Sequence, residues 1–143
     1  MNALHLASSV GTVEIMQTVL ELNANPNAKD SIGRTPLHFA CKRGSLDHFN
    51  ILIQIEEIDL DAQTNAGVTP LMCAVQSGNI QLVAACLNNH MNPFLKDGLE
   101  TTALQYASRF VDVLGIDMRS LISEAMDQWQ AQTTEAERME SQI

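Results

Sequence analysis

The sequence predicts an all-α solenoid, a row of stacked helix-turn-helix units, from two observations. A six-residue segment starting at Thr35 returns at Thr69, 34 residues later, and at Thr102, a further 33 residues later, and an earlier copy starts at Asn2. Apolar residues at helical spacing lie within the copies and after them. A fixed period of roughly 20–50 residues is the signature of repeat architectures. Four copies occupy almost the whole chain.

Each copy carries the signals of a short helix followed by a second one. Thr35 can cap the free amides of a first turn, and Pro36 suits the first helical position because no donor is lost there. Gly44 follows as a helix end, where a glycine readily takes a positive φ, and the chain then reverses into an apolar stretch around Phe49. A single pair of helices cannot bury both of its faces. Stacking on neighbouring pairs must therefore stabilise the array.

The repeated segment reads TPLHFA at 35–40, TPLMCA at 69–74, TALQYA at 102–107 and NALHLA at 2–7. In this motif and its period, the chain resembles the ankyrin-repeat family. The resemblance implies an ankyrin-repeat solenoid whose helix pairs are joined by short β-hairpin-like fingers. The fourth copy departs from the pattern, because Glu100 stands at the finger glycine. We therefore expect a distorted fourth finger.

The expected organisation is one array followed by a polar C-terminal tail. The array covers residues 1–130, with repeats at about 1–31, 32–65, 66–98 and 99–130, and the tail covers 131–143. The first repeat has no finger before it, which suits either a short cap or a chain with further repeats upstream. The tail is expected to fray, to extend the preceding helix, or to link to a further domain.

The last repeat is expected to close the stack with an amphipathic helix that starts at Asp117. Its apolar residues share one face at helical spacing. They are Met118, Leu121, Ile122, Ala125, Met126 and Trp129.

Composition and charge narrow the classes of partner. Hydrophobic residues make up 45% of the chain and aromatic residues only 4%, which suits thin helices packed through aliphatic side chains. The net charge of −9 repels phosphate backbones and anionic lipids, so neither nucleic acid nor a membrane is an expected partner. The first twenty residues contain no basic leader, and no apolar run approaches the ~20 residues of a membrane span. We expect an intracellular protein, cytoplasmic or nuclear.

The sequence contains no recognisable catalytic, cofactor-binding or metal-binding motif, so the protein is predicted not to be an enzyme and to need no cofactor. Cys41, Cys73 and Cys86 lack a metal-ligand spacing and are predicted to be free, buried thiols. The resemblance implies that His5 and His38 fix the hairpins by hydrogen bonding. The acidic group at residues 56–61 is interpreted as a solvated loop.

The resemblance places the binding surface on the concave side, formed by the finger tips and the exposed residues of the first helices. Six of the eight Lys and Arg residues fall on this side, which favours an acidic or phosphorylated segment as partner. The alternative is that these residues only keep the surface soluble. The candidate partner-binding residues are Lys29, Ser31, Ile32, Arg34, Lys42, Arg43, Asn65, Val68, Gln76, Lys96, Arg109 and Phe110.

The sequence therefore predicts a non-catalytic protein-protein interaction module or scaffold, monomeric unless its end caps are incomplete. Two alternatives stay open. The chain could be the regulatory or substrate-recruiting segment of a larger enzyme or channel, with the chemistry located elsewhere. It could also be an assembly module that stacks through its ends.

Overall fold

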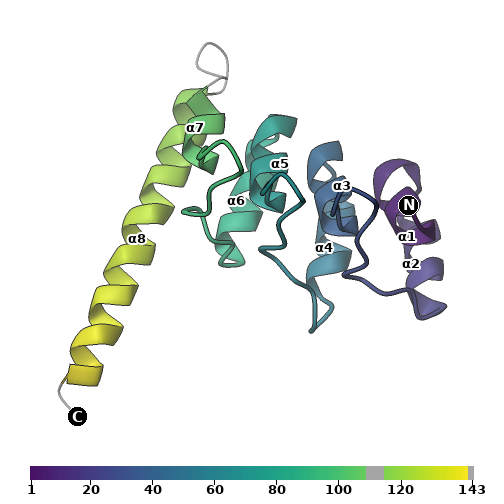
Figure 1. Cartoon of the computed structure of the whole chain (residues 1–143), viewed down its shortest axis with the longest axis horizontal. Coiled ribbons are helices and arrows are strands. Elements are labelled where there is room, and N and C mark those ends of the chain that lie inside the picture. Colours follow the sequence, from purple (N-terminus) through teal and green to yellow (C-terminus); the bar gives the residue numbers. More distant parts are fainter. Residues whose placement is uncertain (109–114, 142–143) are drawn as a thin grey trace.

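The computed structural model of the chain describes residues 1–108 and 115–141, and within these ranges all regular structure is helical (Figure 1). The helices are α1 (Ala3–Val10), α2 (Val13–Glu21), α3 (Pro36–Arg43), α4 (Leu46–Ile53), α5 (Pro70–Ser77), α6 (Ile80–Asn88), α7 (Ala103–Ala107) and α8 (Gly115–Ser141). They form four antiparallel pairs, one for each copy of the motif. The predicted all-α solenoid is confirmed.

The pairs stack in two layers, visible as parallel rows in Figure 1. The inner helices α1, α3, α5 and α7 pack side by side in this order, and the outer helices α2, α4, α6 and α8 pack behind them. Leu4, Leu37 and Leu71, from the same position of successive repeats, are fully buried between these layers. The core is therefore a continuous strip rather than a compact centre.

Helix α3 begins and ends at the residues that its sequence predicts. Pro36 takes the first position of α3, and Gly44 ends this helix with a φ of +78°. The His38 ring completes the helix start, because its Nδ1 accepts the backbone N–H of Thr35 at 3.0 Å. Its Nε2 donates to the carbonyl of Val68 at 2.8 Å, which ties the second repeat to the third. This pattern needs a neutral ring with its proton on Nε2.

His5 makes the equivalent contacts one repeat earlier. Its Nδ1 accepts the backbone N–H of Asn2 at 3.0 Å, and its Nε2 lies 2.7 Å from the carbonyl of Ala28 and 3.0 Å from that of Arg34. Both histidines therefore link a helix start to the following finger. The structural role predicted for His5 and His38 is confirmed.

The state of His38 predicts a pH dependence of stability. Burial lowers the pKa of His38 below its ordinary value of 6.5, although the hydrogen bond to Val68 opposes the shift. Below pH 6.5 the unfolded chain binds a proton at His38 more readily than the folded chain does, so protonation favours unfolding. The contribution of His38 to stability is therefore present above pH 6.5 and is lost as pH falls. We expect the melting temperature to fall more between pH 7.5 and pH 5.5 in the parent than in His38→Gln.

Glutamine suits this comparison because Gln105 occupies the equivalent position of the fourth repeat, where its Oε1 accepts the backbone N–H of Thr102 at 2.9 Å. The variant thus keeps an acceptor for the helix start and removes the titrating group. Circular dichroism melts of both proteins at the two pH values give the measurement. Equal pH dependence in parent and variant would rule out His38 as a source of it.

The fingers are hydrogen-bonded turns at residues 30–34, 64–68 and 97–101. In each, the first residue donates its N–H to the carbonyl of the last residue at 2.9–3.0 Å. Successive fingers are also joined, because Asn65 N donates to the carbonyl of Ile32 at 2.9 Å and Gly98 N donates to that of Ala66 at 2.7 Å. The fingers therefore form a connected layer along the inner helices.

The fourth finger keeps the geometry of the others, so the predicted distortion is wrong. Glu100 takes a φ of +61° and donates its N–H to the carbonyl of Asp97 at 3.0 Å, as Gly67 does to Thr64. At Gly67, an added Cβ would lie 2.9 Å from the backbone nitrogen of Gly98 in the next finger. No described finger lies beyond Glu100, so its side chain meets no such obstacle and only the left-handed backbone strain remains.

Helix α8 begins at Gly115, two residues before the predicted start at Asp117, and it continues to Ser141. Residues 131–141 thus extend the helix rather than fraying. The predicted apolar face lies against α6 and α7, with Met118 and Ile122 fully buried and Trp129 half-buried. Beyond Trp129 every described residue is exposed, and the helix projects past the array (Figure 1).

Candidate functional site

The candidate site is a groove of about 230 Å³ on the face formed by the fingers and the inner helices, which we call the finger face. It lies between the second and third repeats. The finger at residues 30–34 and helix α3 contribute Ile32, Arg34, His38, Phe39 and Lys42, and the finger at residues 64–68 and helix α5 contribute Thr64, Ala66, Val68, Cys73 and Gln76.

The groove exists because equivalent positions carry residues of different size in the two repeats. Phe39 and Cys73 share one position on the inner helices and are 8% and 7% exposed. Ile32 and Ala66 share one position at the finger tips, and the isoleucine is 49% exposed. Large side chains on one side thus face small ones on the other. The space that the smaller side chains of the third repeat leave unfilled forms the groove.

The groove contains two positively charged side chains with different surroundings. Arg34 donates from Nε to Asp30 at 2.6 Å, and its guanidinium lies 4.7 Å from the centroid of the Phe39 ring, so this cation is held in place. Lys42 is exposed on α3 and makes no ion pair within the described residues. Because Asp30 neutralises part of the charge of Arg34, Lys42 contributes most of the net positive charge.

Cys73 lies in the groove but is poorly suited to nucleophilic chemistry. Burial raises the pKa of its thiol to about 11, and the nearby charges of Lys42 and Arg34 lower it only in part. A thiol with such a pKa is almost entirely protonated at neutral pH. Cys41, Cys73 and Cys86 are all free and buried, as predicted. The groove therefore offers apolar surface and positive charge for binding rather than a reactive group.

Five of the predicted partner-binding residues line the groove: Ile32, Arg34, Lys42, Val68 and Gln76. Three more belong to the finger region beside it. Lys29 and Ser31 are exposed there, and Asn65 links two fingers by donating its side-chain amide to the carbonyl of Ser31 at 3.4 Å.

The remaining predicted residues are not part of the groove. Arg43 turns toward the preceding repeat, where its Nη1 donates to the carbonyl of Gly11 at 2.7 Å. Lys96 is exposed and pairs with Glu100 at 3.4 Å. Arg109 and Phe110 lie outside the described residues.

Sequence reasoning assigned Phe39 and Cys73 no place in the binding surface. Cys73 was predicted to be a buried thiol, which it is, yet it also lines the groove. An available signal was the change from Phe39 to Cys73 at one repeat position, followed by Tyr106 in the next copy. A comparison of side-chain size at equivalent positions of the repeats would have indicated a cavity beside Cys73.

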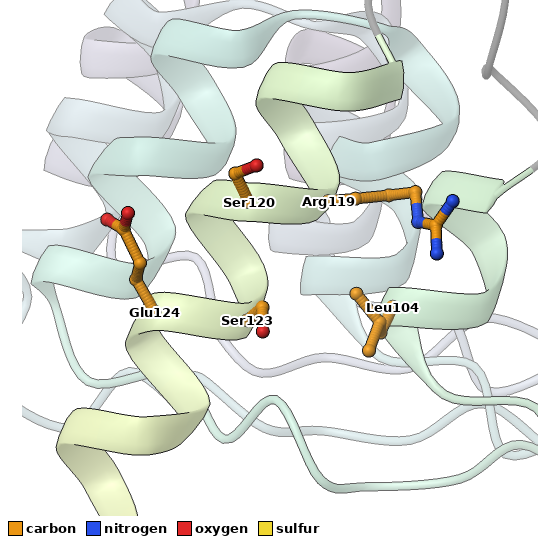
Figure 2. Close-up of a pocket in the computed structure, with 5 residues that line it drawn as sticks. All are labelled: Leu104, Arg119, Ser120, Ser123 and Glu124. Carbon is orange, nitrogen blue, oxygen red and sulfur yellow. The ribbon is translucent and has the colours of Figure 1, made fainter.

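A second hollow, of about 430 Å³, lies at the end of the array between α7 and α8. It is lined by Leu104, Arg119, Ser120, Ser123 and Glu124. Figure 2 shows Arg119 extending toward α7 while Glu124 lies on the opposite side of α8, so the polar groups do not converge on one point. This hollow is therefore a weaker candidate than the groove.

Comparison with known proteins identifies the family. A family model described as "Ankyrin repeats (3 copies)" matches residues 1–64, and one described as "Ankyrin repeats (many copies)" matches residues 52–107. Together with the repeat architecture, these matches show that the chain belongs to the ankyrin-repeat family. Ankyrin repeats are generally non-catalytic modules for protein-protein interaction.

The chain is also similar to segments of much longer proteins. It is 35% identical over 106 residues to neurogenic locus notch homolog protein 1 of Homo sapiens, and 32% identical over 126 residues to the protein of that name of Xenopus tropicalis. The human neurogenic locus notch homolog protein 2 is 35% identical over 106 residues. The matches cover 74–87% of this chain but only 4–5% of those proteins.

Two further features limit the chemistry of the described part of the chain. Residues 1–108 and 115–141 contain no helix that combines the length and the apolar character needed to cross a membrane. In the same ranges, no group of three or more His, Cys, Asp or Glu side chains is arranged to hold a metal ion.

Proposed function

We propose that the finger face binds a segment of another protein, that the groove is the centre of this interaction, and that the bound segment is acidic or phosphorylated. The observation that carries the proposal is the groove itself. It brings apolar surface and the cations Arg34 and Lys42 together on one face of a protein with a net charge of −9.

The charge distribution favours this class of partner. A strongly negative chain repels acidic segments from most of its surface, so attraction depends on a local excess of positive charge. Lys42 supplies such an excess at the groove, and the exposed Lys29 lies in the adjoining finger region. Exposed charges act over about 8 Å at physiological ionic strength, which confines the attraction to the finger face.

The proposal predicts that Lys29→Glu combined with Lys42→Glu weakens binding by about tenfold, mainly through slower association. Binding segments would first be selected from a displayed library of random peptides with the parent protein. Their affinities for parent and variant would then be measured by biolayer interferometry at low and physiological salt. We expect acidic residues to be enriched in the selected peptides, and parent binding to weaken as salt rises.

A matched control places an equal change of net charge on the outer helices. Gln17, Asn50 and Gln81 are exposed on these helices, and Gln54 is exposed directly after α4. Changing all four to Glu lowers the net charge by the same amount as the two lysine reversals. This control should bind nearly as well as the parent and melt at a similar temperature. Equal losses in both variants, or selected peptides without acidic enrichment, would contradict the proposed binding face.

A further inference from the structure

We propose that the groove holds one apolar side chain of the bound segment while Lys42 and Arg34 hold a carboxylate next to it. The recognised sequence would then be an aliphatic residue adjacent to Asp or Glu. This inference rests on the proposed function of the finger face and adds the chemical feature that the face selects.

The apolar part of the inference follows from the lining of the groove. Phe39 and Cys73 form nearly buried surface, the half-buried Val68 adds an aliphatic surface, and Ile32 at the finger tip is 49% exposed. An aliphatic side chain that enters removes water from this surface, which is favourable. The thiol of Cys73 is protonated and uncharged at neutral pH, so it does not oppose apolar contact.

The position of the groove follows from the differences between repeats. Tyr106 occupies in the fourth repeat the position of Cys73, and its hydroxyl donates to Asp97. Lys42 is replaced by Gln76 at the equivalent position of the third repeat. Among the described repeats, the step from a large to a small side chain and the positive charge therefore coincide at the second and third.

The carboxylate part follows from the charges beside the apolar surface. Lys42 and Arg34 line the same groove as Cys73, so both cations border its apolar surface. Asp30 holds Nε of Arg34, while Nη1 and Nη2 make no hydrogen bond within the described residues. A carboxylate next to the buried side chain can therefore pair with Lys42 and with the free edge of Arg34.

The test uses variants that fill the groove with residues from the chain's own repeats. Cys73→Phe introduces the residue of position 39, and Ala66→Ile introduces that of position 32. Cys73→Ala is the control that leaves the groove open. The second filling variant changes an exposed finger residue, so it remains informative if Cys73→Phe alters folding, which melting curves of all three variants would reveal.

The probes are three short synthetic peptides in a Gly-Ser background, with a central Leu-Glu, Ala-Glu or Leu-Gln pair. Binding would be followed by NMR titration of the ¹⁵N-labelled protein. We expect the Leu-Glu peptide to shift the amides of Ala66, Val68 and Gln76, and the Ala-Glu peptide to bind at least about tenfold more weakly. Both filling variants should weaken the Leu-Glu peptide to a similar extent, whereas Cys73→Ala should not.

Two outcomes would overturn the inference. One is saturable binding of the Leu-Glu peptide that neither filling variant weakens, and the other is the absence of saturable binding by that peptide. The Leu-Gln peptide tests the role of the carboxylate. If it binds as tightly as the Leu-Glu peptide, the proposed pairing of a carboxylate with Lys42 and Arg34 is wrong. The proposed function is judged separately by the charge reversals with their selected peptides. An acidic partner bound without an apolar anchor would thus reject the inference and leave the proposed function standing.

Discussion

Deletion of residues 117–143 is expected to destabilise the whole array and to promote aggregation. The deletion removes Met118 and Ile122, which are fully buried, and the partly buried Leu121, Met126 and Trp129. Each fully buried large apolar side chain contributes about 1.5–3 kcal/mol. The combined loss is on the order of 5 kcal/mol, comparable with the total ~5–15 kcal/mol of a typical domain. The surfaces of α6 and α7 would then be exposed to solvent.

The matched control is deletion of residues 133–143 only. Residues 133–141 are helical and exposed, so this shorter deletion should change the free energy of unfolding by no more than about 0.5 kcal/mol. Melting by circular dichroism and mass by light scattering give the two readouts. A longer truncation that melts at the parent temperature and stays monomeric would show that α8 does not cap the stack. The comparison also tests the predicted end of the array near residue 130.

The helices were predictable because their signals are local and repeated. Thr35 and Pro36 start α3 through backbone chemistry that acts within one turn, and Gly44 ends it by its own conformation. The same arrangement returns at Thr69, Pro70 and Gly78. Each copy thus supports the interpretation of the others, and the stacking follows from apolar faces that a single pair cannot bury.

The expectation of a distorted fourth finger was wrong because a neighbouring repeat determines whether that position needs a glycine. Distortion was expected because Glu100 stands where Gly33 and Gly67 stand in the other fingers. Those glycines are needed because the next finger lies close to them, and Glu100 faces no further finger among the described residues. The assignment of Arg43 to the binding surface, made from its repeat position, stays a prediction. In the structure Arg43 reaches the carbonyl of Gly11 in the preceding repeat, since Gly11 precedes α2 close to the end of α3.

The groove was only half predictable for a related reason. The polar and charged residues Arg34, Lys42 and Gln76 could be placed from the family pattern, because their positions in the finger and the first helix are ones that the resemblance assigns to the binding surface. The cavity itself depends on a difference in volume between Phe39 and Cys73 across a repeat interface. No single repeat contains this information, and a consensus pattern removes it by averaging the copies.

Leu37→Ala is expected to lower the free energy of unfolding by roughly 2–5 kcal/mol, the usual range for a large side chain removed from a core. Leu37 is fully buried between the second repeat and its neighbours, so the cavity left by the lost atoms cannot fill with water at no cost. Urea denaturation of parent and variant measures the change. A loss below about 0.5 kcal/mol would place Leu37 outside the core.

Leu104→Ala is the matched control, because Leu104 holds the same position of the motif in the fourth repeat. It is only partly buried and lines the hollow shown with Arg119 in Figure 2. Water already reaches this side chain, so its truncation should cost less than that of Leu37. If both variants lose the same free energy of unfolding, burial by a following repeat is not the reason that the leucine at this position stabilises the array. A clear difference would assign the larger part of the effect at Leu37 to the stacking of one repeat on the next.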